Sequence, residues 1–373
     1  MTTVTPGVYF QATSPPAAVP AQTGVPAFLG FASGGPWTAT ALSPADDVSA
    51  AFPATGFLDA AVQGFFANGG RRCHVVRLRA DQPAATALAA GLAALEDADA
   101  DLICLPDLVN VPTWADASDL GPVTSAQRLA LDHCADRGDR FAVLDAVPSS
   151  SATVVAAQRQ ALGGPSASFG ALYAPWVLAD SKAVVPPCGH VSGIYAAMDA
   201  AAGTQRAPAG VELAALLDVQ VAWGDADLAS LTSSGVNVVR ALRGRGLRPW
   251  GARTVSDDPQ WRDITARRVV TELVRWLETF MTGLVDEPND VRLWVTIMRE
   301  VTAYLDGLYQ RGALRGATAD AAFYVKCDSE TNPPAQRAGG QVVTQVGVAL
   351  AAQAEVLVLN VVRTPDAAVA QVT

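Results

Sequence analysis

Apolar residues follow two different spacings along the first half of the chain. Between about residues 57 and 182, short apolar runs alternate with segments in which apolar residues recur every three or four positions. The runs indicate buried strands, and the helical spacing indicates helices that pack on them. We expect strands at 73–78, 101–106, 141–146 and 169–173, and helices at 57–66, 86–98, 125–136 and 152–162. This alternation predicts βαβ units on a mostly parallel sheet.

The rhythm changes after the Pro186-Pro187 pair. A helix is predicted at 189–201. The β-prone stretch 237–255, with turn glycines Gly244 and Gly246, predicts a hairpin.

Two long amphipathic helices are predicted next, because apolar residues recur at helical spacing over 270–284 and over 293–308. Pro288 separates them, since proline cannot continue a helix, and Asn289 is the expected N-cap of the second helix. Strands are expected at 322–327, 342–350 and 356–362. The second half of the chain is therefore predicted to be α+β.

The N-terminal end has a different character, with prolines on both sides of the β-prone run 7–11. This pattern is typical of an extended arm or an edge strand. A length of 373 residues, at ~100–200 residues per domain, predicts two domains between the ends. The expected segments are an N-terminal arm (1–26), an α/β domain (27–185), an α+β domain (186–354) and a C-terminal arm strand (355–373).

Half of the residues are hydrophobic and 17% are charged, which suits a large buried core. The net charge of −10 argues against a general nucleic-acid or membrane ligand, because both surfaces are also negative. We therefore expect no nucleic-acid partner and no direct membrane insertion. One acid-free stretch is positive, and it contains Arg240, Arg243, Arg245, Arg248 and Arg253. This patch could bind phosphate, form a solvated hairpin or contact an acidic partner.

Targeting signals are missing from the sequence. The N-terminus lacks the basic and apolar regions of a signal peptide, and no apolar run reaches the ~18 residues of a membrane span. The five cysteines are widely spaced, as in a protein with reduced thiols. We expect assembly in the cytoplasm.

Common catalytic and cofactor motifs are missing too. The chain contains no GxSxG, GxGxxG, Walker A or HExxH pattern, and it has three histidines. We expect no catalytic residue, no cofactor and no metal site. The alternative is a cytosolic α/β enzyme of unknown reaction, with His190 as base and Ser192 as nucleophile. Such a pair more often fixes a turn before a helix.

Several segments, taken together in their order, resemble the sheath proteins of contractile phage tails and of related injection particles. They are Pro6–Phe10, Asn68–Gly70 with Cys73–Arg77, Pro186–Tyr195, Ala207–Ala209, Trp250–Thr254, Arg267-Arg268, Glu287–Asn289 and Cys327-Asp328. The resemblance is strongest over 186–363 and looser over 27–182. Asp286 departs from it, since an aromatic residue is common there in the family.

The resemblance implies a structural subunit that polymerises as a six-fold helical homopolymer around an inner tube. Its further partners would be baseplate and terminator or cap proteins. Contraction of the polymer would drive the tube into a target, within a phage-tail-like particle that either stays in the cell or is released from it. Residues 27–185 would then form the outer domain, and 186–354 the inner domain that faces the tube. A static tube or shell protein is the other alternative.

Arms at both ends would add strands to the sheets of neighbouring subunits, which leaves an open, heterologous assembly. The expected arm strands contain Val8, Tyr9, Phe10 and Gln11 at one end and Val356, Leu357, Val358, Leu359 and Val361 at the other.

Contacts to the tube or to neighbours are expected from the positive patch and from exposed charges on the two long helices. These residues are Arg240, Arg243, Arg245, Arg248, Arg267, Arg268, Arg292 and Arg299. In the alternative, the helix arginines pair with Glu272, Glu278 and Glu300 along their own helices.

Overall fold

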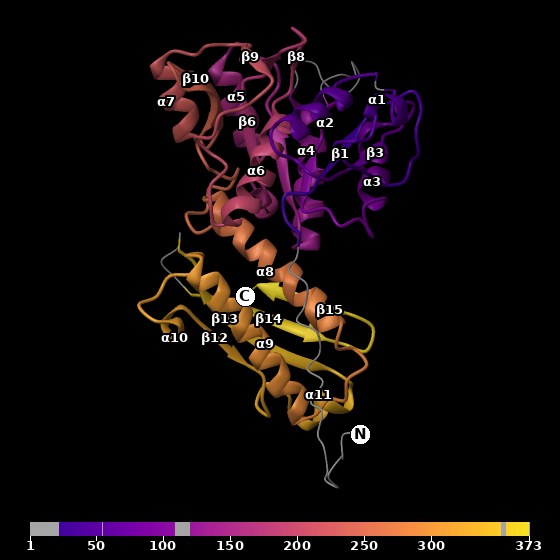
Figure 1. Cartoon of the computed structure of the whole chain (residues 1–373), viewed down its shortest axis with the longest axis vertical. Coiled ribbons are helices and arrows are strands. Elements are labelled where there is room, and N and C mark those ends of the chain that lie inside the picture. Colours follow the sequence, from indigo (N-terminus) through magenta and orange to yellow (C-terminus); the bar gives the residue numbers. More distant parts are fainter. Residues whose placement is uncertain (1–21, 54, 109–119, 352–355, 373) are drawn as a thin grey trace, which may run out of the picture.

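The structure is a computed structural model that describes residues 22–53, 55–108, 120–351 and 356–372. Two bodies lie one above the other in Figure 1, and helix α8 (Ile264–Thr282) runs between them. The first body contains a mostly parallel sheet, and the second contains an antiparallel sheet with two long helices. The predicted combination of α/β and α+β architecture is confirmed.

The sheet of the first body has eight strands in the order β11-β10-β6-β5-β4-β1-β3-β2. The inner pairs are parallel, and only β2 and β11 at the two edges run antiparallel to their neighbours. The strands are β1 (Pro26–Gly30), β2 (Thr40–Leu42), β3 (Cys73–Arg77), β4 (Leu102–Cys104), β5 (Phe141–Asp145), β6 (Gly170–Ala174), β10 (Asn237–Leu242) and β11 (Gly246–Trp250).

Helices cover both faces of this sheet, because successive strand residues point to opposite sides. Ala27 and Leu29 of β1 face the core under one helix layer, whereas Phe28 faces the core under the other. The first layer contains α3 (Ala84–Ala93), α4 (Gly121–Arg137), α5 (Ala152–Ala161) and α7 (Asp225–Ser233). The second contains α1 (Val48–Ala51), α2 (Leu58–Ala67) and α6 (Cys188–Ala202).

Strand β1 was not predicted, because the proline-rich segment before it suggested an arm as far as residue 26. Pro26 is the first residue of the strand, where a missing backbone N–H is tolerated even inside a sheet. A smaller sheet in the order β8-β7-β9 lies beside the hairpin. It consists of β7 (Val177–Ala179), β8 (Val184–Val185) and β9 (Leu216–Val219), and the 3₁₀ helix η1 (Pro165–Phe169) precedes β6.

The second body packs α8 and α9 (Val291–Gln310) on a four-stranded antiparallel sheet in the order β12-β13-β14-β15. Its core joins Leu273 and Leu277 of α8, Ile297 of α9, and Val346 and Leu359 of the sheet. The strands are β12 (Phe323–Lys326), β13 (Val342–Ala349), β14 (Val356–Arg363) and β15 (Ala368–Val372), and the short helices are α10 (Ala319–Ala322) and α11 (Pro334–Ala338).

The N-cap of α9 differs from the expectation. Asp290, not Asn289, accepts hydrogen bonds from the backbone N–H groups of Arg292 and Leu293. Asn289 instead accepts a hydrogen bond from the Trp294 indole at 2.9 Å. Both residues accept hydrogen bonds at the start of α9. Asp290 takes the N-cap position, where its carboxylate is the better acceptor near the positive end of the helix dipole.

The boundary between the two bodies lies near residue 264 and not at the predicted position 186. Helix α6 belongs to the first body, since Cys188, Val191 and Tyr195 share a core with Phe28. Strand β10 also belongs there, because it pairs in parallel with β6. The Pro186-Pro187 pair lies just before α6, and strands and helices continue to alternate after it as far as β10.

Buried ion pairs join the two bodies and the segment that leads into β1. Arg268 of α8 donates to Asp101 at 2.9 Å and to Asp199 of α6 at 2.6 Å, and all three side chains are almost fully buried. Asp101 also accepts hydrogen bonds from the backbone N–H groups of Gly24 and Val25. One guanidinium thus connects α8, α6 and the first described residues of the chain.

Candidate interaction surfaces

The predicted hairpin is confirmed, and it holds the positive patch on the surface. Strands β10 and β11 pair antiparallel through a turn in which Gly244 and Gly246 have φ of 70° and 72°, a region that favours glycine. Arg243 and Arg245 are exposed at this turn. Arg248 is held back along the hairpin by an ion pair to Glu212 at 3.2 Å.

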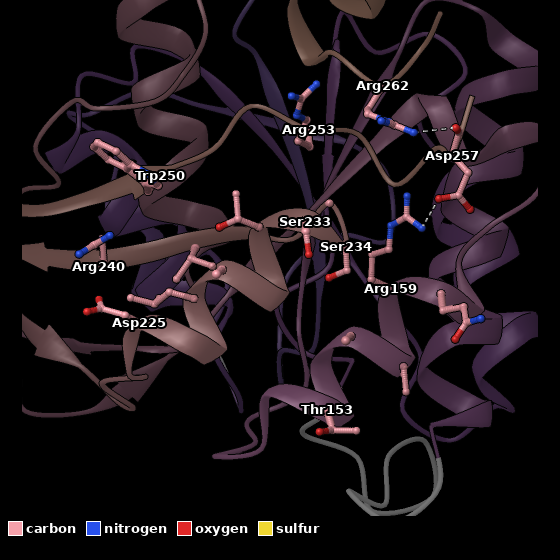
Figure 2. A pocket seen from close by; sticks show the side chains of 18 residues that line it. Thr153, Arg159, Asp225, Ser233, Ser234, Arg240, Trp250, Arg253, Asp257 and Arg262 are labelled. Carbon is pink, nitrogen blue, oxygen red and sulfur yellow. Dashed lines mark hydrogen bonds and ion pairs between the residues drawn. The ribbon is translucent and has the colours of Figure 1, made fainter. Parts of the chain in front are cut away.

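A cationic groove with a volume of about 1030 Å³ lies behind the hairpin, between α5, α7 and the chain after β11. Figure 2 shows four arginines around it, together with Trp250 at one end and Ser233 and Ser234 in the middle. The arginines are Arg159, Arg240, Arg253 and Arg262.

The four guanidinium groups are not equally free. Arg159 is buried and pairs with Asp257 at 2.6 Å, and Arg262 donates to the Asp257 carbonyl at 3.2 Å. Arg240 lies 5.7 Å from the Trp250 ring centre. Within the described residues, the side chains of Arg240, Arg253 and Arg262 have no ion pair, and neither has Asp225 of the same groove. The groove therefore keeps a net of two positive charges, and an exposed indole borders it.

Arg267 and Arg268 were expected on an exposed face of α8, and this prediction is wrong. Both are buried, with 6% and 3% of their surface accessible. Arg268 pairs inside the chain with Asp101 and Asp199. The sequence signal was ambiguous because a helix between two bodies has two buried faces.

Arg267 is held between two aromatic rings. Its guanidinium carbon lies 3.6 Å from the Trp261 ring centre and 4.1 Å from that of Phe169. One nitrogen donates to the Ser168 hydroxyl at 2.7 Å. Burial lowers the pKa of Arg267 to about 9, because the charged form is poorly solvated there.

Arg292 and Arg299 of α9 are exposed. Arg299 pairs with the neighbouring Glu300 at 2.7 Å, as the alternative for the helix arginines proposed. Glu272 accepts from Thr204 and Tyr304 and pairs with Arg311 at the end of α9 at 3.6 Å. Glu278 accepts from the backbone N–H of Ala370.

The two predicted arm strands have different outcomes. Val8, Tyr9, Phe10 and Gln11 lie outside the described residues. The segment with Val356, Leu357, Val358, Leu359 and Val361 is β14, which pairs along its length with β13 and along most of it with β15. Its assignment as an arm strand for a neighbour's sheet is therefore wrong, since both of its edges are already occupied. Alternate residues of β14 enter the core of its own body, which fixes its register.

The residues of the enzyme alternative are buried on α6. Ser192 donates to the Cys188 carbonyl at 2.7 Å and lies 3.0 Å from the Cys104 sulfur. His190 packs where Gly64 of α2 leaves room, and burial lowers its pKa to about 4. Neither side chain borders a groove described above, and both contribute to the contact of α6 with the rest of the first body.

Three residues of the cationic groove were not predicted from the sequence. They are Arg159, Arg262 and Trp250, whose indole borders the positive charges. Arg159 is far from the patch in sequence and joins it because α5 packs on α7. Trp250 could have been noticed, since it closes the hairpin at a position whose side chain points away from the core. Its exposed fraction is 47%.

Two family models together match most of the chain. The phage tail sheath protein central domain matches residues 81–255, and the phage tail sheath C-terminal domain matches residues 256–364. The break between them, after residue 255, lies shortly before α8 and the structural boundary. No curated protein sequence matches the chain.

Solved structures agree with this class. A chain of the anti-feeding prophage baseplate is 28% identical, with a TM-score of 0.73 over 95% of this chain and 97% of that one. A chain of the contracted anti-feeding prophage sheath is 27% identical, with a TM-score of 0.72 over 95% and 98%. The sheath tail protein of Desulfitobacterium hafniense shares the fold at 12% identity, with a TM-score of 0.67 over 96% and 100%.

The fold and the matched domains thus define a contractile sheath subunit, a structural protein. This chain belongs to the phage tail sheath family. In the part of the chain that the structure describes, no helix has the length and apolarity to cross a membrane.

Proposed function

We propose that this sheath protein forms a six-fold helical homopolymer around an inner tube, and that contraction of the polymer drives the tube into a target. The observation that carries the proposal is the likeness to the contracted anti-feeding prophage sheath, which extends over 95% of this chain. The subunit acts through its interfaces and performs no catalysis. Assembly takes place in the cytoplasm, within a phage-tail-like particle.

The partners follow from the same likeness. One related chain belongs to the anti-feeding prophage baseplate, which supports a baseplate contact for this subunit. We propose the inner tube and a terminator or cap protein as its other partners, because a tubular polymer needs an axis and an end.

Strand addition is the proposed linkage between subunits. Strand β15 pairs with β14 on one side, and no strand of the described residues pairs with its other side, where the Ala370 backbone N–H is bonded to Glu278 of α8. An edge without a neighbouring strand can accept one from another chain, once this side-chain bond is exchanged for a strand partner. We propose that residues 8–11 of a neighbour provide it, and that β15 replaces β14 as the C-terminal segment that exchanges between subunits.

Deletion of residues 1–20 tests this linkage. The truncated chain should remain soluble and keep its circular dichroism spectrum, since every helix and strand that the structure describes lies outside the deleted residues. It should fail to form tubes in negative-stain electron microscopy under conditions in which the full chain forms them. Normal tubes from the truncated chain would contradict the arm linkage.

The hairpin arginines test the contact surface. Arg243→Glu with Arg245→Glu should block assembly, because two exposed positive charges become negative. The thermal midpoint should stay within about 2 °C of the wild-type value, since a surface change costs little stability. Unchanged tubes would exclude these residues from the contact, whereas the exposed pair Arg292 and Arg299 would remain candidates.

A further inference from the structure

The cationic groove has the composition of a binding surface. Trp250 is 47% exposed, and Arg240 lies 5.7 Å from the centre of its ring. Tryptophan and arginine are the residues most enriched where protein interfaces gain their energy. The groove also contains Asp225 and Asp257. Four arginines against two aspartates leave it positive, and the free charges of Arg240 and Arg253 face an open volume (Figure 2).

A second groove, with a volume of about 1010 Å³, has the opposite charge. It lies where the first body meets α8 and β15, and its wall includes Glu96, Asp97 and Asp136. These three side chains are exposed and form no ion pair within the described residues. The negative charges of the nearby Asp99 and Asp139 are neutralised within the chain, because both carboxylates form ion pairs with Arg275. This surface therefore carries a negative charge that the chain itself does not neutralise.

We propose that the cationic groove of one copy binds the acidic groove of another copy. The two surfaces lie on different parts of the molecule. The cationic groove is bordered by α5, α7 and β10, and the acidic groove by the end of α4, by α8 and by β15 (Figure 1). A contact between two unlike surfaces is heterologous, so each bound copy leaves one groove free for the next. The contact rests on the proposed self-assembly and names the two surfaces that perform it.

The positive charge of the cationic groove favours an acidic partner. The chain as a whole has a net charge of −10, so an acidic surface is the most abundant partner for this groove in a homopolymer. Exposed charges attract over the Debye length, which is about 8 Å at physiological ionic strength. Assembly through this contact should therefore weaken as salt is added.

Two variants with reversed charges test the proposal together. Arg240→Glu with Arg253→Glu makes the cationic groove negative, and Glu96→Arg with Asp97→Arg makes the acidic groove positive. Each variant alone then presents two surfaces of like charge and should assemble about tenfold less in a sedimentation assay. Mixed in equal amounts, the variants again offer opposite charges at every contact, so the mixture should recover the wild-type yield of polymer.

The outcomes separate the possible failures. Recovery in the mixture supports the contact, because misfolded variants could not rescue each other. Two soluble, folded variants that stay unassembled when mixed would overturn it, and so would either variant assembling as the wild type does. Arg71→Glu with Lys182→Glu is the matched control, since both residues are exposed outside the two grooves and this variant should assemble normally. If the wild-type chain itself formed no polymer, the proposed sheath function would fail instead.

Discussion

The buried arginines of α8 and the exposed arginines of the hairpin use one side chain in opposite ways. Arg268 is 3% exposed and lies between two carboxylates, whereas Arg243 is exposed at a turn. Burial makes a charge depend on its partners, since desolvation costs several kcal/mol per ion. Exposure leaves the charge free to meet another molecule. The same residue type thus holds the subunit together in one region and is available for assembly in the other.

The largest loss of stability is expected when the buried arginine, Arg268, is replaced. Arg268→Met should lower the free energy of unfolding by about 3–5 kcal/mol, because Asp101 and Asp199 would remain buried without their partner. Urea unfolding monitored by circular dichroism measures the change. Adding Asp101→Asn and Asp199→Asn should recover part of the loss, since no uncompensated charge would then remain. A loss below about 1 kcal/mol for Arg268→Met would show that the pairing is not stabilising.

The half-buried Asp145 differs from Asp101 and Asp199, because it has no arginine partner among the described residues. One oxygen of Asp145 accepts the Cys188 backbone N–H at 2.8 Å, and the other has no partner among the described residues. Burial raises the pKa of Asp145 to about 7, compared with about 3.9 in an unfolded chain.

Between pH about 4 and about 7, the folded chain therefore keeps a proton that the unfolded chain has lost. The contribution of Asp145 to the free energy of unfolding should fall as pH rises through this window, by up to about 1.4 kcal/mol per pH unit. Asp145→Asn should remove this slope, because the amide does not titrate. Parallel pH profiles for the wild type and this variant would contradict the prediction, and the exposed Asp227→Asn is the control.

The smallest loss of stability is expected for an exposed arginine on the solvent side of α9. Arg299 has 53% of its side chain exposed and pairs with its neighbour Glu300. Arg299→Ala should change the free energy of unfolding by less than about 0.5 kcal/mol, because exposed ion pairs contribute little. The same urea titration measures it. A loss above about 1 kcal/mol would mean that the difference between buried and exposed arginines is smaller than the structure indicates.

Much of the fold could be predicted from periodicity. The strands from β3 to β6 and the helices α2, α8 and α9 lie close to the expected positions, because long periodic segments give strong signals. The domain boundary could not be predicted in this way. Strand β10 joins the first sheet through a pairing with β6 that connects distant parts of the chain, and local patterns contain no information about such pairings.

The interaction surface was predictable only in part. The exposed hairpin followed from Gly244, Gly246 and the acid-free stretch around them. The burial of Arg267 did not follow, because the aromatic rings that enclose it come from Phe169 and Trp261. Likewise, nothing local distinguishes β14 from an arm strand, since an alternating apolar strand has the same sequence pattern with one paired edge or two.

The position of β1 has a mechanical consequence for any subunit whose N-terminal segment is pulled. Strand β1 lies in the middle of the sheet and pairs in parallel with β3 on one side and β4 on the other. Extracting β1 would therefore require the hydrogen bonds on both of its sides to break. Among the described strands, β15 pairs with β14 alone, so fewer backbone bonds would have to break. The N-terminal connection should therefore withstand a greater force than the C-terminal one.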